Sequence, residues 1–253
     1  MKTIDLNCDM GESYGTYVLG YDELAMPYVT SINVACGFHA SDPDNMSKTV
    51  MLAHKHRIAI GAHPGFPDLV GFGRRTMALT PDEVKNAVIY QIGALDAFCR
   101  ATGVAMQHVK AHGALYNMAE KDLSIATAIA AAIQEVNPTL YMLCLANSKM
   151  VVAAKQQGIP FVEEAFADRA YTDEGTLVSR KVAGSVVHDI TQVVTRVVRM
   201  VKDHSVISIT GKEVPIEAQT ICVHGDTPGA VDMVKALREA LDKENIKLQA
   251  FGA

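Results

Sequence analysis

The chain has 253 residues, of which 49% are hydrophobic and 20% are charged, so it is long enough to bury the core of one barrel-sized domain. Its formal net charge of −5 gives no reason to expect binding to nucleic acid or to an anionic membrane surface. A small, mostly uncharged partner fits this composition better.

The N-terminal segment MKTIDLNCDMGE reaches acidic residues too early to contain the apolar core of a signal peptide. No uninterrupted apolar stretch approaches the roughly 20 residues that span a bilayer. The five cysteines are widely spaced and form no CxxC pair. We therefore expect a cytoplasmic protein with reduced thiols.

Short β-prone apolar runs alternate with helical patterns along the whole chain. The runs predict strands at about 3–7, 31–36, 58–62, 106–110, 140–145, 160–164 and 220–224. The helical patterns predict helices at about 42–56, 80–102, 123–135, 148–157, 186–201 and 229–245. The second helix has Thr80 as its N-cap and Pro81 at its first position. A strand followed by a helix, repeated about seven times, predicts a parallel sheet with helices outside.

We expect this sheet to close into a distorted seven-stranded parallel (β/α) barrel. Polar residues follow nearly every strand instead of one switch point, and no GxGxxG motif follows the first strand. Seven strands in place of eight indicate an incomplete or distorted ring. The segment 205–217, SVISITGKEVPIE, interrupts the alternation and is typical of a β-ribbon insertion. We find no linker, so we expect residues 1–253 to form a single barrel domain.

The polar strand ends predict one pocket, because loops at this end build the active sites of (β/α) barrels. Side chains alternate along a strand, so Asp5, Asn7 and Asp9 should share the face towards the barrel mouth. Small residues such as Ala35 and Gly61 would leave room there for a ligand. This arrangement indicates an enzyme.

The same alternation brings further polar groups towards the pocket. Lys110 and His112 should share a face with His108, which lies deeper in its strand and is expected to be structural. His63 and His224 follow the third and seventh strands. Any one of these residues could be a capping or hydrogen-bonded group, so the functional interpretation depends on their convergence.

Two loops carry additional signals. The segment 61–75, GAHPGFPDLVGFGRR, is too long for a simple connector, and its Arg74 and Arg75 could meet a carboxylate or phosphate or could instead pair with surface acids. The segment 225–231, GDTPGAV, leads into the last helix, where free amides suit an anion and a plain N-cap is equally consistent. No phosphate-binding P-loop occurs. No GxSxG motif is present either, so a serine-hydrolase mechanism is not expected.

Several of these segments together resemble one known family. The chain closely resembles the LamB/YcsF family in DLNCDMGESYG, NVACGFHASDP, IGAHPGFPDLVGFGRR, VKAHGALYN, FADRAY, LVSR and VHGDTPGAV. The resemblance runs from Asp5 to at least Val231. Ala111 is a departure, since proline is expected there, but the neighbouring Lys110 and His112 are intact.

The resemblance implies an ATP-dependent opening of the lactam of 5-oxo-L-proline to L-glutamate, carried out with 5-oxoprolinase subunits B and C. It also implies a barrel similar to the glycoside hydrolase/deacetylase group, which agrees with the seven strands counted above. No phosphate-binding loop is recognisable in the sequence, so the expectation of ATP and its accompanying Mg²⁺ comes from the resemblance alone.

The chemistry of a lactam suggests roles for the candidate residues. Phosphorylation of the carbonyl oxygen would activate the amide, and Asp9 or His112 could then act as the general base for water. Lys110 would stabilise negative charge on oxygen or phosphate. An arginine would hold the substrate carboxylate. The residues expected to bind substrate are Asn7, His39, His63, Arg74, Arg75, Arg169 and His224.

A protein-held divalent metal is a further possibility, because imidazoles and carboxylates are ligands of Zn²⁺ and Mn²⁺ hydrolases. The candidate ligands are Asp5, Asp9, His39, His63 and His112. Two other functions stay open. One is a metal-dependent deacetylase or amidohydrolase that acts without ATP. The other is a non-catalytic subunit that binds 5-oxoproline or a partner, for which the 205–217 ribbon is a candidate surface.

Overall fold

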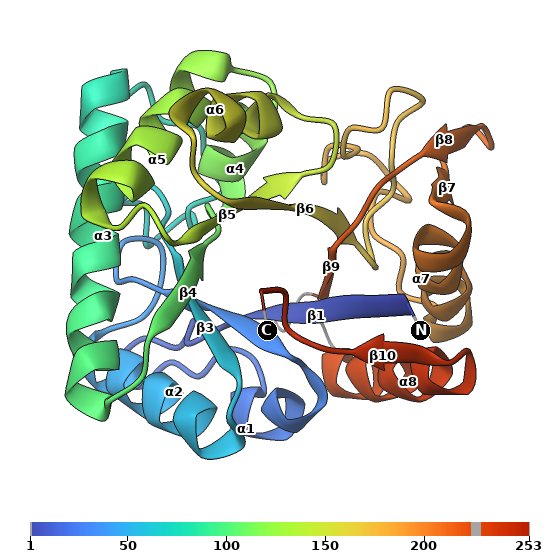
Figure 1. Cartoon of the computed structure of the whole chain (residues 1–253), viewed down its shortest axis with the longest axis horizontal. Helices are drawn as coiled ribbons and strands as arrows, with labels where there is room; N and C mark the ends of the chain where they lie inside the picture. Colours follow the sequence, from blue (N-terminus) through green and yellow to red (C-terminus); the bar gives the residue numbers. More distant parts are fainter. Residues whose placement is uncertain (1, 224–228, 253) are drawn as a thin grey trace.

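Seven parallel strands form a closed ring with helices around it (Figure 1). The computed structural model describes residues 2–223 and 229–252. The strands of the ring are β1 (Lys2–Met10), β2 (Ser31–Ala35), β3 (Ala59–His63), β4 (Met106–Val109), β5 (Tyr141–Leu145), β6 (Phe161–Phe166) and β9 (Thr220–Val223). They pair in this order, and β9 pairs back onto β1 to close the ring. The predicted distorted seven-stranded (β/α) barrel is confirmed.

The six predicted helices are all present. They are α2 (Pro43–His56), α3 (Pro81–Thr102), α5 (Leu123–Val136), α6 (Lys149–Gln157), α7 (Ile190–Asp203) and α8 (Ala230–Lys243). The start of α3 is a capping box, in which Thr80 accepts from the Glu83 amide and the Glu83 side chain accepts from the Thr80 amide. The predicted start of α7 at residue 186 is wrong by four residues, because the Asp189 side chain caps the helix at Gln192 N.

Four short elements were not predicted from the sequence. They are α1 (Asp22–Ala25), the 3₁₀-helix η1 (Met26–Tyr28), α4 (Gly113–Ala119) and β10 (Ile246–Leu248). Each has at most seven residues, so hydrophobic periodicity has too few repeats to indicate it. Within residues 205–217, β7 (Ser205–Ile207) and β8 (Glu213–Pro215) pair antiparallel, outside the ring.

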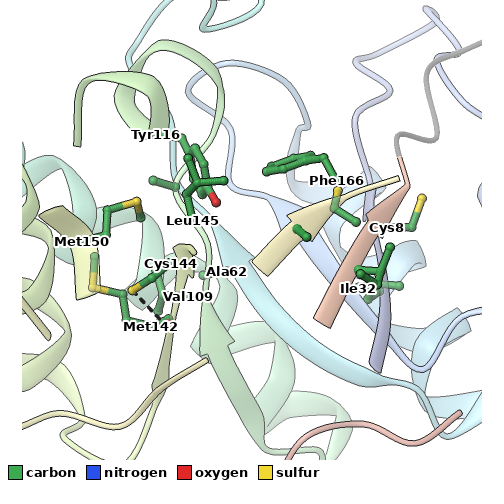
Figure 2. Close-up of a cluster of buried hydrophobic side chains, with 14 of the residues drawn as sticks. Cys8, Ile32, Ala62, Val109, Tyr116, Met142, Cys144, Leu145, Met150 and Phe166 are labelled. Carbon is green, nitrogen blue, oxygen red and sulfur yellow. Dashed lines mark hydrogen bonds between the residues drawn. The ribbon is translucent and has the colours of Figure 1, made fainter. Parts of the chain in front are cut away.

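An apolar layer packs between the ring and the helices, and it follows from strand alternation. On β1, the side chains of Leu6 and Cys8 are fully buried on the helix side. Figure 2 shows Met142 and Cys144 of β5 beside Met150 of α6. Full burial of a Leu or Met side chain contributes roughly 1.5–3 kcal/mol. All five cysteines are buried free thiols.

The C-terminal segment after β10 runs back beside the ring (Figure 1). The Phe251 ring lies 5.3 Å from the His108 ring and 5.4 Å from the Tyr141 ring, centroid to centroid. Gln107 donates a hydrogen bond to the Phe251 carbonyl oxygen over 2.6 Å. These contacts lie near the N-terminal ends of β4 and β5.

In the described part of the chain, no helix is long and apolar enough to cross a membrane.

Candidate active site at the barrel mouth

A cavity of about 410 Å³ lies at the C-terminal ends of the strands, within the range of roughly 300–1,000 Å³ typical of small-molecule sites. Its lining comes mainly from β1, β3, β6 and α4, and from the loops after β1, β3, β4 and β6. The buried polar residues of the lining include Asp9, Glu12, His63, Lys110 and His112. The cations that line it are Arg74, Lys121, Arg169, Arg180 and Lys181 in addition to Lys110. An acidic and imidazole interior therefore meets a cationic rim.

Lys110 stands at the centre of the buried network and is 2% exposed. Its Nζ lies 2.8 Å from Glu164 Oε1, 3.0 Å from Cys222 Sγ, and 3.2 Å from both Asp9 Oδ1 and Asn7 Oδ1. Burial lowers the pKa of Lys110, but the Asp9 carboxylate, helped by Glu164, outweighs burial and holds that pKa well above its ordinary value. Lys110 is therefore a fixed cation at neutral pH.

Glu164 is fully buried on β6 and was not among the predicted site residues. It accepts hydrogen bonds from Asn7 Nδ2 and from the Tyr116 hydroxyl, both over 2.9 Å. Burial, together with the Glu164 carboxylate, raises the pKa of Tyr116 well above its ordinary value. The sequence feature that could have indicated Glu164 is a carboxylate inside an apolar strand, because a carboxylate is rarely buried without a partner.

Asp9 connects two halves of the site. Its Oδ1 accepts from Asn33 Nδ2 over 2.9 Å and from Lys110 Nζ over 3.2 Å. Its Oδ2 lies 3.4 Å from His63 Nε2. The carboxylate therefore touches the lysine on one side and an imidazole on the other.

Three imidazoles and one carboxylate gather beside Asp9. They belong to Glu12, His39, His63 and His112, and one ligand atom from each lies within 4.8 Å of all the others. His63 ends β3, whereas Glu12 and His39 follow β1 and β2. The structure can thus hold a metal ion at these four residues.

Neighbouring glycines make room for the imidazoles. The His39 and His112 rings stack at a centroid distance of 3.6 Å and an interplanar angle of 3°. A Cβ on Gly73 would lie 2.7 Å from His39 Cβ and 2.8 Å from His112 Cδ2, and Gly73 has φ +61°. A Cβ on Gly65 would lie 2.7 Å from His39 Nδ1. Burial lowers the pKa of both His39 and His112 well below the ordinary value, so these rings are neutral at pH 7.

The deeper polar residues stabilise the barrel interior. Asp5 is 1% exposed and accepts from the hydroxyls of Thr30 and Ser31 over 2.6 and 2.8 Å, and also from Thr220. Burial raises the pKa of Asp5 to about 6, although these hydrogen bonds act in the opposite direction. Asp5 is not in the histidine group, where Glu12 stands instead. Glu12 follows the end of β1, beside Gly11, so the polar strand-end pattern could have indicated it.

Gly61 does not open space for a ligand, and that expectation is wrong. A Cβ on Gly61 would lie 2.1 Å from the His108 ring, because β3 and β4 pair with Gly61 opposite His108. His108 Nε2 lies 2.7 Å from Asn33 Oδ1. The imidazole fills the interior that the glycine leaves.

The predicted arginines lie in different surroundings. Arg74 lines the cavity, with its guanidinium 4.8 Å from the Phe72 ring centroid. Arg75 instead pairs with Asp68 and is not part of the cavity lining. Arg169 lines the cavity and donates to the Val178 carbonyl oxygen over 2.6 Å. Burial, with the nearby Arg180, lowers the pKa of Arg169 to about 10, so it remains a cation. His224 and the loop residues 225–228 lie outside the described residues.

Known proteins similar to this chain cover nearly all of it. The LamB/YcsF family profile matches residues 4–253. A curated relative from Clostridium beijerinckii, named as the A subunit of 5-oxoprolinase, is 54% identical over 248 residues, which cover 98% of this chain and 97% of the relative. The crystal structure of a lactam utilization protein from Thermus thermophilus is similar with a TM-score of 0.94 and 45% identity, over 98% of this chain and 100% of that chain. A GH113 β-1,4-mannanase, 10% identical with a TM-score of 0.51 over 94% and 99% of the two chains, shares the fold alone.

Proposed function

The chain belongs to the LamB/YcsF family, and from this membership we propose that it is the subunit of a 5-oxoprolinase that opens the lactam of 5-oxo-L-proline to L-glutamate. The observation that carries the proposal is the enclosed group of Asp9, Lys110 and Glu164 at the base of a cavity with cationic walls. Such a cavity suits a small anionic amide.

The proposed reaction begins with a lactam whose carbonyl oxygen has been phosphorylated, which makes the carbonyl carbon susceptible to water. Asp9 takes a proton from water as the water oxygen bonds to that carbon. Lys110 stabilises the negative charge that develops on oxygen. The ring C–N bond then breaks, the nitrogen takes up a proton, and a second water hydrolyses the resulting acyl phosphate to glutamate and phosphate.

Asp9 is a better candidate for the general base than His112. One His112 nitrogen, Nε2, lies 2.8 Å from the Phe72 carbonyl oxygen, and the other, Nδ1, lies 3.0 Å from His63 Nε2. Both imidazole nitrogens thus face protein atoms. Asp9 lines the cavity, and its carboxylate offers several acceptor positions.

The cations of the rim would hold the substrate carboxylate and the phosphoryl group. We assign the carboxylate to Arg74 or Arg169, since both line the cavity and Arg75 is paired with Asp68. ATP with Mg²⁺ serves the assembled enzyme, in which we propose subunits B and C as partners and the cytoplasm as the location. The buried free thiols are consistent with a reducing compartment.

The proposal is tested by reconstitution of the enzyme from its separately purified subunits. ATP consumption and glutamate release are followed separately, with and without this chain. We expect glutamate release to need the chain and to fall at least about 100-fold with Lys110→Ala, because removal of one charge-stabilising group costs roughly 10²–10³ in rate. Lys243→Ala, at an exposed position on α8, is the control. Near-normal release with Lys110→Ala would remove Lys110 from the mechanism.

A second candidate function follows from the three imidazoles, which resemble the ligand sets of metal hydrolases. In this case the isolated chain would hydrolyse an N-acetylated amide without ATP. Activity of the isolated chain that is lost after chelation would favour this function. A chain that binds 5-oxoproline while cavity variants leave turnover intact would instead be a non-catalytic binding subunit.

A further inference from the structure

Two histidine nitrogens face each other at the mouth of the barrel without a hydrogen to share. His63 Nδ1 lies 2.8 Å from the Lys110 carbonyl oxygen, and His112 Nε2 lies 2.8 Å from the Phe72 carbonyl oxygen. A carbonyl oxygen can only accept, so each of these ring nitrogens carries the N–H. A neutral imidazole has one N–H, which leaves His63 Nε2 and His112 Nδ1 as bare lone pairs 3.0 Å apart.

Such a contact is repulsive unless a positive charge lies at it. Both rings are buried, His63 at 1% and His112 at 4% exposure, so solvent does not relieve this repulsion. The Asp9 carboxylate approaches the same position, with Oδ2 3.4 Å from His63 Nε2. The arrangement of bare nitrogens and carboxylate oxygens is that of ligands directed at a cation.

His39 provides an independent observation. The side chain is 1% exposed, and neither of its nitrogens makes a hydrogen bond to any residue that the structure describes. Its Nε2 lies 3.5 Å from Glu12 Oε1, and its ring is stacked on His112. A buried imidazole without a hydrogen bond is uncommon in proteins and needs an explanation. A metal ion would supply the missing partner.

We infer that Glu12, His39, His63 and His112 form a binding site for one first-row divalent transition-metal ion. Imidazole nitrogens favour Zn²⁺, Fe²⁺, Ni²⁺ and related ions, whereas Mg²⁺ and Ca²⁺ prefer ligand sets of oxygen alone. The carbonyl oxygens of Lys110 and Phe72 orient two of the imidazoles, as outer hydrogen-bond acceptors commonly do around metal-bound histidine.

The site opens on the same cavity as Lys110, because Glu12, His63 and His112 all line that cavity. A bound divalent ion would add positive charge beside the Asp9 carboxylate. The four residues are brought together by the chain itself, so the site does not depend on which substrate the cavity takes.

Metal content tests the inference directly. The full chain, purified with a tag that lacks histidine, is stripped with a chelator and incubated with Zn²⁺, Mn²⁺, Co²⁺, Ni²⁺ or Mg²⁺ separately. Elemental analysis after desalting gives the stoichiometry, and the thermal unfolding midpoint reports binding to the folded state. We expect about one transition-metal ion per chain, a raised midpoint, and no such effect of Mg²⁺.

Conservative variants locate the ion. Glu12→Gln and His39→Gln keep the approximate size of each side chain and should each weaken binding by more than about 100-fold, because even outer-residue changes cost roughly 10–100-fold. His204→Gln is the matched control, since His204 is exposed and pairs with Glu217 on the surface. Circular dichroism of each metal-free variant checks that it folds.

Three results would overturn the inference. They are wild-type chain without transition metal at any micromolar concentration, binding that survives both Glu12→Gln and His39→Gln, and a nitrogen NMR spectrum that shows a protonated His63–His112 pair in a chain that takes up no metal. Metal at these residues in a chain that gives no glutamate with its partners would uphold the inference and oppose the proposed function. A chain that takes up no transition metal but gives glutamate with its partners would overturn the inference and uphold the proposed function.

Discussion

Asp9 is the residue on which the two halves of the site depend. Its two oxygens separate their contacts, one towards Lys110 and Asn33 and the other towards His63. A change at Asp9 should therefore alter both the lysine network and the imidazoles, which makes it the least separable residue of the pocket. Substitutions of Lys110 and of His39 should have more separate effects, because Lys110 belongs to the lysine network and His39 to the imidazole group.

At Asp5, the raised pKa predicts a pH-dependent loss of stability. A carboxyl group with a folded pKa of about 6 and an ordinary value of 3.8 binds more protons folded than unfolded between these two values. Its contribution therefore favours folding at low pH and declines as pH rises through about 6. From pH 5 to pH 7 this group alone should lower the free energy of unfolding by about 1 kcal/mol.

Urea unfolding of the wild type and of Asp5→Asn at pH 5, 6 and 7 measures this effect. The variant lacks the titrating carboxyl, so the difference in unfolding free energy between the two proteins should shift by about 1 kcal/mol in favour of the variant between pH 5 and 7. Any constant cost of the substitution cancels in this comparison. A difference that does not change with pH would contradict the assignment.

Gly73 predicts a specific effect on the imidazoles. An alanine there meets His39 and His112 at 2.7 and 2.8 Å and must adopt φ +61°. We expect Gly73→Ala to lower the free energy of unfolding by about 1–3 kcal/mol and to impair any ligand binding at the two histidines.

Gly93→Ala is the matched control for Gly73→Ala. A Cβ at Gly93, which is exposed on α3, would contact nothing within 4 Å. This change should instead stabilise the chain by about 0.5–1 kcal/mol, because alanine is the better helix former. Thermal unfolding of both variants distinguishes the two effects, and equal shifts would mean that the close contacts at Gly73 are unimportant.

Among the elements, the capping box of α3 should matter for stability alone. Thr80→Ala removes the hydroxyl that accepts from the Glu83 amide and should cost about 1 kcal/mol in urea unfolding. The residue is exposed and lies outside the cavity lining, so glutamate release by the reconstituted enzyme should be unchanged. A loss of turnover without a loss of stability would show that α3 has a role beyond packing.

The elements also show what a sequence can predict. Long amphipathic helices and alternating strands follow from local periodicity, and the parity of β1 and β4 correctly brought Asn7, Asp9 and Lys110 together. The contact between Gly61 and His108 depends on the register of β3 with β4, which no single segment encodes.

For Glu164 and Glu12 the sequence offers a weak signal but does not define their contacts. Glu164 acquires its partners only when the ring closes through the pairing of β6 with β9 and of β9 with β1, because its contacts come from Asn7, Lys110 and Tyr116. Glu12 lies past the end of a strand, where alternation no longer predicts a direction. The polar residues at the strand ends therefore predict where the pocket lies better than they predict which residues line it.

For the whole molecule, charge is distributed unevenly. The chain carries a formal net charge of −5, yet Arg74, Lys121, Arg169, Arg180 and Lys181 all line the cavity. A cationic opening on an acidic protein favours the approach of small anions, and salt screens this attraction. The KM for 5-oxoproline should therefore rise with ionic strength, while kcat changes less.

Lys181→Gln should raise the KM at low salt and flatten its dependence on ionic strength. Steady-state kinetics of the reconstituted enzyme at several salt concentrations, with Lys243→Gln as a control outside the cavity lining, measures this. A KM that is independent of salt in the wild type would rule out attraction by the rim.

The packing of Phe251 at the far end of the ring has a consequence for how the enzyme turns over. The Phe251 side chain lies against His108 and Tyr141, near the N-terminal ends of β4 and β5, whereas the cavity that Lys110 lines lies at the C-terminal ends of the strands. A partner subunit seated over this cavity would meet both the entering substrate and the leaving product. The time that such a partner stays bound would then limit the rate of product release.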